Sequence, residues 1–153
     1  MKKLFYLFLI TLVGGNSFAQ GTSQPKIVRD ANTAFESGKY HEAIQKLKAA
    51  YDKIGTKGSL KEKGKVRFNL AESYRHISRY EEANENYDVC IELKYFDVNP
   101  DVYFLKGEML RMMGDYGKAQ KSYAEYKKIA KDSRVHELEI ALKACEEYKF
   151  YDM

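Results

Sequence analysis

Three segments of the chain share one spacing of small and aromatic residues, and this spacing restricts the possible folds more than any other feature. In each segment a Gly or Ser is followed by further marked residues at intervals of two, three, four and three positions. The marked residues are Gly38, Tyr40, Ala43, Leu47 and Ala50, then Ser78, Tyr80, Ala83, Tyr87 and Cys90, and finally Gly114, Tyr116, Ala119, Tyr123 and Tyr126. The copies are 40 and 36 residues apart, and repeats of this length indicate stacked supersecondary units.

Each copy predicts a helical hairpin. Apolar residues return every three or four positions both before and after the Gly or Ser, which is the period of an amphipathic helix. A Gly between the two helices ends the first one at little conformational cost. One such hairpin cannot bury its apolar face alone, so we expect neighbouring hairpins to stack.

The pattern resembles the tetratricopeptide repeat family, whose first helix also carries a small residue, here Ala31, Ala71 and Gly107. The resemblance implies an all-α, right-handed solenoid of three hairpins at about 25–58, 59–97 and 98–131. Three positions depart from the family pattern, since Ser78 stands at a turn and Cys90 and Tyr126 stand where a final Ala is expected.

Two insertions lengthen the repeats beyond the usual period of about 34 residues. Residues 53–65 are rich in Gly and Lys, and we interpret them as a loop, or as a loop followed by an extra solvated helical turn. In the second insertion Asn99 is expected to cap the next helix and Pro100 to occupy its first turn.

A capping helix is predicted at 132–150, followed by a short tail at 151–153. Val135, Leu138, Leu142 and Cys145 recur at helical spacing, so we expect them to share a buried face. Asp132 or Ser133 is the expected N-cap. A solenoid needs such a terminal element, because its last hairpin otherwise exposes an apolar face.

The N-terminus has the pattern of a secretory signal at 1–19, followed by a short linker at 20–24. Two lysines precede the apolar run Leu4–Val13, and small residues at Ser17 and Ala19 favour cleavage before Gln20. The alternative is a membrane anchor, but the run is shorter than the ~20 residues of a spanning helix. We therefore expect a periplasmic protein with no transmembrane span, and a resemblance to bacterial envelope proteins implies an association with the outer membrane.

The net charge argues against a nucleic-acid-binding protein, and the cysteine content argues against a disulfide-stabilised scaffold. The formal net charge of +4 falls to +2 when Lys2 and Lys3 leave with the signal, and nucleic-acid binders carry a concentrated basic face instead. Two cysteines are too few for a disulfide scaffold. Cys90 and Cys145 are therefore interpreted as small buried side chains, although a disulfide between them stays open until their geometry is known.

No catalytic, metal-binding or cofactor-binding motif is present in the sequence. His41, His76 and His136 lack the two-His spacing of a zinc protease, and no phosphate-binding loop or nucleophile elbow occurs. We expect no enzyme activity, no metal and no cofactor.

Repeats of this family bind peptides or partner segments in a concave groove that the first helices line. By position, the resemblance assigns to this groove Asn32, Phe35, Phe68, Glu72, Arg75, His76, Phe104, Glu108, Arg111 and Met112. The structural alternative is that Phe68 and Phe104 pack between helices and that the Glu–Arg pairs are helical ion pairs. The family's carboxylate clamp is not matched, because Val28 and Phe68 stand where it has lysines.

The lysine run Lys46–Lys65 is the remaining charged feature. It is either a solvated face or an electrostatic patch for an anionic partner such as envelope lipid or polymer.

These observations predict a non-catalytic protein-interaction scaffold of the bacterial cell envelope that binds a protein or peptide segment. The leader and the Tyr-rich repeats also resemble the N-terminal region of Bacteroidota envelope proteins of the PorE type, in which such repeats precede an OmpA-like domain. That resemblance implies a place in a type IX secretion assembly. The alternative is a self-assembling structural module, and the oligomeric state is open.

Overall fold

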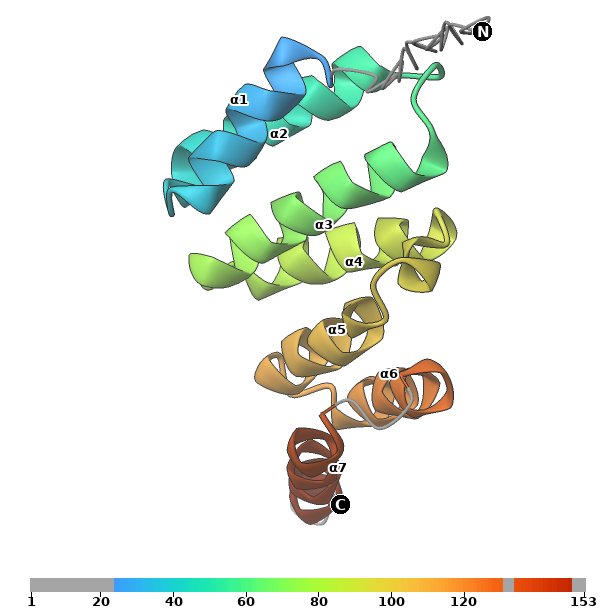
Figure 1. Ribbon diagram of the computed structural model, residues 1–153. Coiled ribbons are helices and arrows are strands. Elements are labelled where there is room, and N and C mark those ends of the chain that lie inside the picture. Colours follow the sequence, from blue (N-terminus) through green and yellow to red (C-terminus); the bar gives the residue numbers. More distant parts are fainter. Residues whose placement is uncertain (1–23, 131–133, 150–153) are drawn as a thin grey trace, which may run out of the picture.

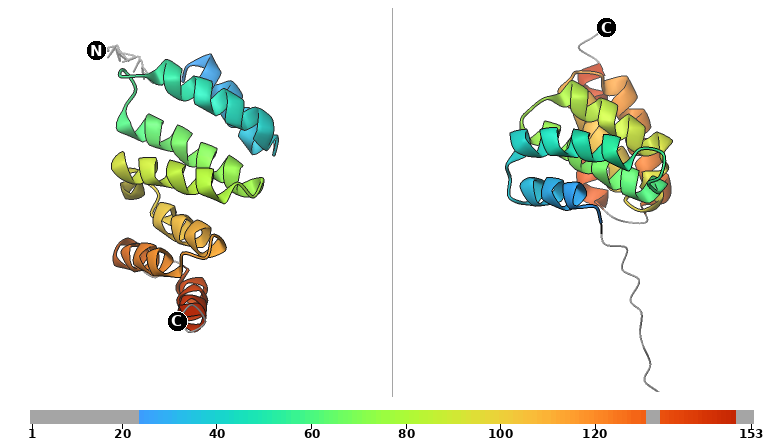
Figure 2. Two further views of the ribbon diagram at one scale, coloured as in Figure 1. Left: turned by 180° about the vertical axis from the view of Figure 1, so that it is seen from behind. Right: turned by 90° about the horizontal axis from the view of Figure 1, so that it is seen from above.

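A computed structural model describes residues 24–130 and 134–149, which form seven α-helices and one short 3-10 helix (Figure 1). The helices are α1 Lys26–Glu36, α2 Tyr40–Ile54, α3 Leu60–His76, α4 Tyr80–Glu92, η1 Tyr95–Asp97, α5 Asp101–Met112, α6 Tyr116–Ile129 and α7 Val135–Lys149. Consecutive helices pair as hairpins that stack in one column, with α7 at the end opposite α1 and α2 (Figures 1 and 2). The predicted all-α solenoid of three hairpins and a C-terminal helix is confirmed.

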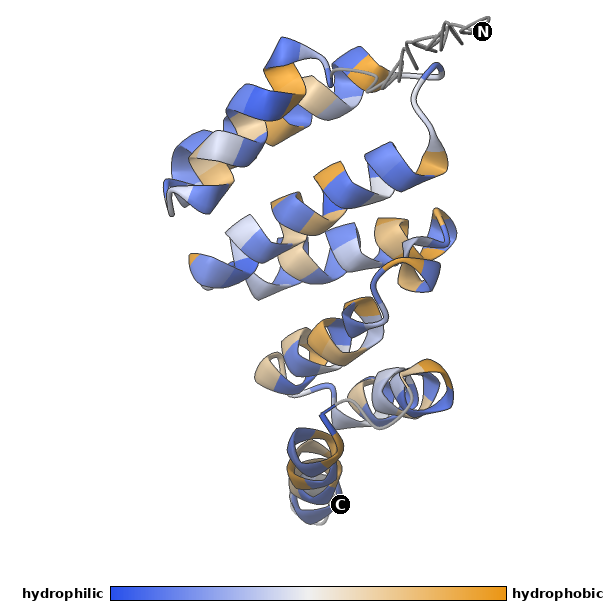
Figure 3. Cartoon of the chain, viewed as in Figure 1, coloured by the Kyte–Doolittle hydropathy of each residue, from blue (hydrophilic) through white to orange (hydrophobic). Residues whose placement is uncertain are grey.

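Several predictions lie outside the described residues. These are the signal at 1–19, most of the linker, the caps Asp132 and Ser133, and the tail. Among the helices that the structure describes, none has the length and apolarity needed to cross a bilayer. Each of them mixes hydrophobic and hydrophilic residues along its length (Figure 3).

The three hairpin turns share one backbone conformation, whatever residue occupies them. Gly38, Ser78 and Gly114 all have positive φ, at 71°, 60° and 81°. In each turn the residue after this position donates its N–H to a carbonyl five residues earlier, as Arg79 does to Tyr74 at 2.9 Å. This is the Schellman ending of a helix. Ser78 therefore adopts a left-handed conformation that favours glycine.

The core consists of two clusters joined through α5. One cluster holds the buried side chains of the first two hairpins together with Val102 and Met109, and the other holds those of α5, α6 and α7. Leu105 packs against both. Cys90 lies in the first cluster and Cys145 in the second, and they form no disulfide. Burial raises the pKa of the Cys90 thiol to about 12.

The two insertions contact each other. Ser59 and Glu62 form a capping box that starts α3, so the first insertion is a loop followed by an extra helical turn. That turn is not wholly solvated, because Gly64 is buried against the ring of Tyr95 in η1, where an added Cβ would lie 2.4 Å from a ring carbon. The prediction that Asn99 caps the next helix and Pro100 lies in its first turn is shifted by one residue, because α5 begins at Asp101 and Pro100 is its N-cap. Asn99 instead accepts a hydrogen bond from the N–H of Asp101 at 3.2 Å.

The prediction for the buried face of α7 is wrong at one position. Leu138 and Cys145 are buried and Leu142 packs against the second core cluster. Val135, by contrast, is 46% exposed and is not part of the second core cluster. Ala141 is buried in the same cluster.

Candidate functional site

A groove of about 890 Å³ lies between α3, α5 and α7. Seven of the ten residues assigned from the sequence line it: Phe68, Glu72, Arg75, Phe104, Glu108, Arg111 and Met112. The side chains come from the C-terminal half of α3, from most of α5 and from one face of α7. The stacking of hairpins thus brings residues from three separate helices to one surface.

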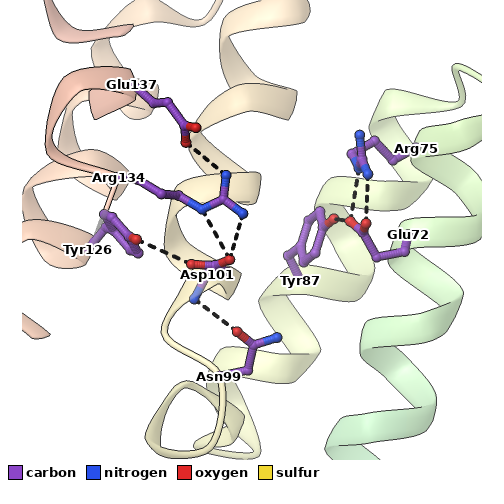
Figure 4. A network of polar contacts seen from close by, with 8 residues as sticks. All are labelled: Glu72, Arg75, Tyr87, Asn99, Asp101, Tyr126, Arg134 and Glu137. Carbon is purple, nitrogen blue, oxygen red and sulfur yellow. Dashed lines mark hydrogen bonds and ion pairs between the residues drawn. The ribbon is translucent and has the colours of Figure 1, made fainter. Parts of the chain in front are cut away.

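The first polar cluster of the groove belongs to the second hairpin. Arg75 donates two hydrogen bonds to the Glu72 carboxylate, from Nε at 2.9 Å and from Nη2 at 2.7 Å. The hydroxyl of Tyr87 on α4 donates to the same carboxylate from the core side (Figure 4). Burial and the nearby Glu72 charge raise the pKa of Tyr87, so its hydroxyl remains a donor. The hydrogen bonds with Glu72 also raise the pKa of Arg75.

An equivalent cluster recurs 36 residues later in the third hairpin. Arg111 donates to Glu108 from Nε at 3.3 Å and from Nη2 at 2.7 Å, and Tyr123 donates from its hydroxyl at 2.5 Å. Burial by itself raises the pKa of the Glu108 carboxyl. The hydrogen bonds from Arg111 and Tyr123 outweigh this effect and hold the pKa below its usual range. Glu108 is therefore ionised at neutral pH.

A third cluster joins α7 to the start of α5. Arg134 donates to Asp101 from Nε at 3.2 Å and Nη2 at 2.9 Å, and to Glu137 from Nη1 at 2.8 Å. The hydroxyl of Tyr126 also donates to Asp101, at 3.2 Å (Figure 4). This cluster differs from the other two, because all three guanidinium nitrogens of its arginine are already engaged.

The groove consequently offers donors rather than acceptors to a ligand. Each carboxylate of Glu72 and Glu108 is shared between an arginine and a tyrosine. By contrast, Nη1 of Arg75 and of Arg111 makes no hydrogen bond within the described part of the chain. These side chains are 31% and 30% exposed, so both guanidinium groups are accessible.

The apolar surface of the groove combines packed rings with exposed aliphatic side chains. Phe104 is buried against Tyr123 and Tyr126, with ring centroids 5.7 and 5.4 Å away. Phe68 packs in the same way against Tyr87 and is half-buried. Both rings are inter-helix packing residues that also form part of the groove wall. Met112 and Ile140 are exposed there, at 51% and 57%.

The other three assigned residues lie away from this groove. Asn32 is buried and accepts a hydrogen bond from the side chain of Asn69 at 2.9 Å. Phe35 packs against the first core cluster, and its ring meets Tyr40 edge-on. His76 is stacked on Tyr40, with centroids 4.3 Å apart. The groove is therefore built by the second and third hairpins and α7, without the first hairpin.

The contribution of α7 was not expected from the sequence, although a signal for it exists. Continuing the 36-residue interval places Ile140 on the position of Phe68 and Phe104, and Ala144 on that of Glu72 and Glu108. Both residues line the groove. In this respect α7 acts as the first helix of a further repeat. The contact between Asp101 and Arg134 is not predicted by the 36-residue interval or by any other sequence pattern.

The described residues contain no candidate metal site. Within 24–130 and 134–149, no group of three His, Cys, Asp or Glu side chains is placed to hold a metal ion.

Comparisons with known proteins identify the fold. No protein-family model matches the chain, and no curated protein matches it. Among solved structures it is similar to the first tetratricopeptide repeat domain of Spaghetti (RPAP3) bound to the HSP90 peptide SRMEEVD. That match has a TM-score of 0.63 and 17% sequence identity, and it covers 79% of this chain and 90% of the other. The comparisons do not support the finer resemblance to PorE-type proteins, which stays a prediction. At this identity the likeness shows the fold alone: the chain is an all-α helical-repeat solenoid with a tetratricopeptide-like architecture.

Proposed function

We propose that this protein is a non-catalytic interaction scaffold whose groove between α3, α5 and α7 binds a segment of a partner protein. The observation that carries the proposal is the combination of an apolar wall with two accessible arginines at equivalent positions of successive repeats. Concave sites with apolar walls and a few well-placed polar groups are the usual form of binding pockets. The similarity to a domain solved with a bound peptide supports the same use.

The unused hydrogen-bonding groups define the chemistry of the segment. Arg75 and Arg111 offer donors, so the ligand supplies acceptors, either main-chain carbonyls of an extended segment or carboxylates. Met112 on α5 and Ile140 on α7 offer exposed apolar contacts in the groove. The fitting partner is an extended segment with an apolar side chain between two acceptor groups.

The groove is tested by paired substitutions that alter its wall without touching the core. Met112→Glu/Ile140→Glu places two carboxylates in the groove, and we expect partner affinity to fall at least about tenfold. Met113→Glu/Val135→Glu is the matched control, because both residues are exposed apolar side chains outside the groove. Partners captured from envelope extract are identified by mass spectrometry, and their segments are titrated as synthetic peptides. Equal affinity for both variants would refute the groove as the binding site.

The arginines are tested separately. Arg75→Glu/Arg111→Glu reverses the charge of both donors, and recovery of the captured partner is expected to fall. Thermal unfolding of the variant is measured alongside, since both residues also pair with Glu72 and Glu108. Unchanged recovery with an unchanged fold contradicts a role for these arginines.

The proposed location is the periplasm, where the scaffold joins envelope proteins of a type IX secretion assembly at the outer membrane. The support is the N-terminal leader, with its lysines, apolar run and small residues before Gln20. N-terminal sequencing of the protein from fractionated cells tests this, with Gln20 as the expected first residue. Recovery of Met1 in the cytoplasmic fraction would contradict it.

Self-assembly is a second candidate function, and exposed apolar residues near the C-terminal end of the stack favour it. Val135, Ile140 and Tyr148 on α7 are all about half exposed, and unpartnered apolar surface of this kind often marks an interface. Light scattering at micromolar concentration separates the two candidates. A monomer excludes self-assembly, whereas an oligomer dispersed by Val135→Glu/Ile140→Glu establishes it.

A further inference from the structure

Six of the seven lysines in the run Lys46–Lys65 form two groups in the structure. Lys46 forms an ion pair with Glu42 at 2.6 Å, and the ammonium of Lys48 lies over the ring of Tyr74. The other group lines a second pocket of about 470 Å³. Its members, spaced four residues apart, are Lys53, Lys57, Lys61 and Lys65. The pocket lies between the start of α1, the end of α2, the following loop and the start of α3, and it shares no residue with the groove.

The charge of this pocket is not neutralised by the protein. None of its four lysines forms an ion pair with any described residue. The one acidic residue in the lining is Glu62, whose carboxylate accepts hydrogen bonds from the N–H and hydroxyl of Ser59 at 3.0 and 2.9 Å. The N-terminus of α3 adds partial positive charge at the same place. An anion is therefore the complementary ligand.

The surface between the lysines is apolar. Val28, Ile54 and Val66 line the pocket, and each is buried. The loop closes tightly over Ile54, because a Cβ at Gly58 would lie 1.7 Å from its Cγ2. Between Lys57 and Lys61, Leu60 is 58% exposed. The site thus combines cations, an apolar interior and a protruding leucine.

The kind of cation bears on how an anion is held. Arginine binds carboxylate or phosphate through two parallel hydrogen bonds of fixed geometry, whereas the lysine ammonium is a compact point charge that binds phosphate without a fixed orientation. All four cations in this pocket are lysines. Lysines beside an exposed apolar side chain are typical of proteins that bind anionic membrane surfaces. A phosphate headgroup would meet the lysines, and its lipid chain the apolar interior.

We propose that this lysine pocket docks the protein on an anionic phospholipid surface, with Leu60 entering the lipid interface. The pocket is lined by α1, the end of α2 and the start of α3, whereas the groove is lined by the C-terminal half of α3, by α5 and by α7. Docking through the pocket therefore leaves the groove open to a partner segment. This membrane contact goes beyond the scaffold function and does not depend on it.

The absence of tryptophan from the chain allows a site-specific test on the full-length protein. Leu60→Trp introduces a single fluorophore at the start of α3, and Met113→Trp places the same reporter on an exposed position in the turn between α5 and α6. Vesicles of phosphatidylcholine with about one-third phosphatidylglycerol should shift the Leu60→Trp emission to the blue, while pure phosphatidylcholine should not. The Met113→Trp emission should not move with either vesicle.

Charge reversal then tests the lysines. On the Leu60→Trp background, Lys57→Glu/Lys61→Glu should weaken binding to the anionic vesicles about tenfold or more. Lys121→Glu/Lys127→Glu on α6 makes the same change in net charge at exposed lysines outside the pocket, and it should bind normally. Emission unmoved by anionic vesicles, or an equal loss in both charge variants, overturns the proposal. A polyglutamate peptide that moves the emission when vesicles do not also overturns it, in favour of an acidic protein segment.

Discussion

The second and third hairpins carry equivalent Glu–Arg–Tyr clusters in different surroundings. Tyr87 and Tyr123 are both fully buried, but the Glu72 side chain is 12% exposed and the Glu108 side chain 25%. The second hairpin lies in the middle of the stack, and the third is followed by the single helix α7. The position of a hairpin in the stack therefore decides how exposed the Glu side chain of its cluster is.

Two glycine positions make the comparison sharper. The third hairpin has Gly107 where the second has Ala71, and the Tyr123 ring occupies the space that a Cβ would need. The same relation holds at the turns, since the second hairpin has Ser78 and the third has Gly114, both with positive φ. The third hairpin thus has glycine at both positions where the second carries a side chain.

The largest difference is expected between Glu72→Gln and Glu108→Gln. Loss of the Glu72 charge leaves Arg75 without its partner in a more buried site, and the free energy of unfolding should fall by about 2–4 kcal/mol. Glu108→Gln should cost about 1–2 kcal/mol, because water reaches this pair more readily. Urea unfolding measures both. Equal losses would show that depth in the stack does not control these clusters.

Gly107→Ala should destabilise the third hairpin by about 1–3 kcal/mol. The new Cβ would lie 2.4 Å from Cε1 of Tyr123. The free-energy cost of such overpacking exceeds the gain from the higher helix propensity of alanine. Gly117→Ala on α6 is the control, since its Cβ meets nothing within 4 Å, and it should be neutral or stabilising. If the two variants have the same urea midpoint, the Tyr123 ring moves aside without cost.

Acid should reduce the contribution of Glu108. Its pKa in the folded protein lies below the usual 4.5, so the unfolded chain takes up the proton first as pH falls. The stability from Glu108 is therefore present above about pH 4.5 and is lost as pH falls through the lowered pKa. The difference in unfolding free energy between wild type and Glu108→Gln should narrow from about pH 7 to about pH 3. A constant difference over that range contradicts this assignment.

The smallest effect is expected at the turns. Ser78→Gly should stabilise the protein by about 0.5–1 kcal/mol, because glycine adopts the positive φ of 60° without the cost borne by serine. Gly114→Ser, the reverse change in the third hairpin, should destabilise by a similar amount. Thermal unfolding of the two variants should therefore shift in opposite directions. Shifts in the same direction would mean that the side chain, rather than the backbone, controls these turns.

The hairpins were predictable because their determinants are local. The periodicity of apolar residues and the repeated Gly, Tyr and Ala specify two helices and a turn whatever lies beyond them. The Glu72–Arg75 and Glu108–Arg111 ion pairs, three residues apart, were foreseeable for the same reason. Cys90 and Cys145 were interpreted correctly as buried side chains.

The candidate site was predictable only in part. Seven of the ten assigned residues share one groove, since equivalent positions of stacked first helices face the same side. Asn32, Phe35 and His76 do not, because contacts with Asn69 and Tyr40 turn them to other surroundings. Whether the groove binds a partner stays a prediction.

By itself, the sequence determined the repeat, its period and the helical class, since these depend on neighbours within one or two turns of helix. The tertiary structure alone decided which side chains meet from distant helices. Asp101 reaches Arg134 across 33 residues, the Tyr87 hydroxyl lies on Glu72, and four lysines surround an apolar pocket. These contacts depend on how helices pack within a hairpin and on how one hairpin is stacked on the next, and neither is specified by a local sequence pattern.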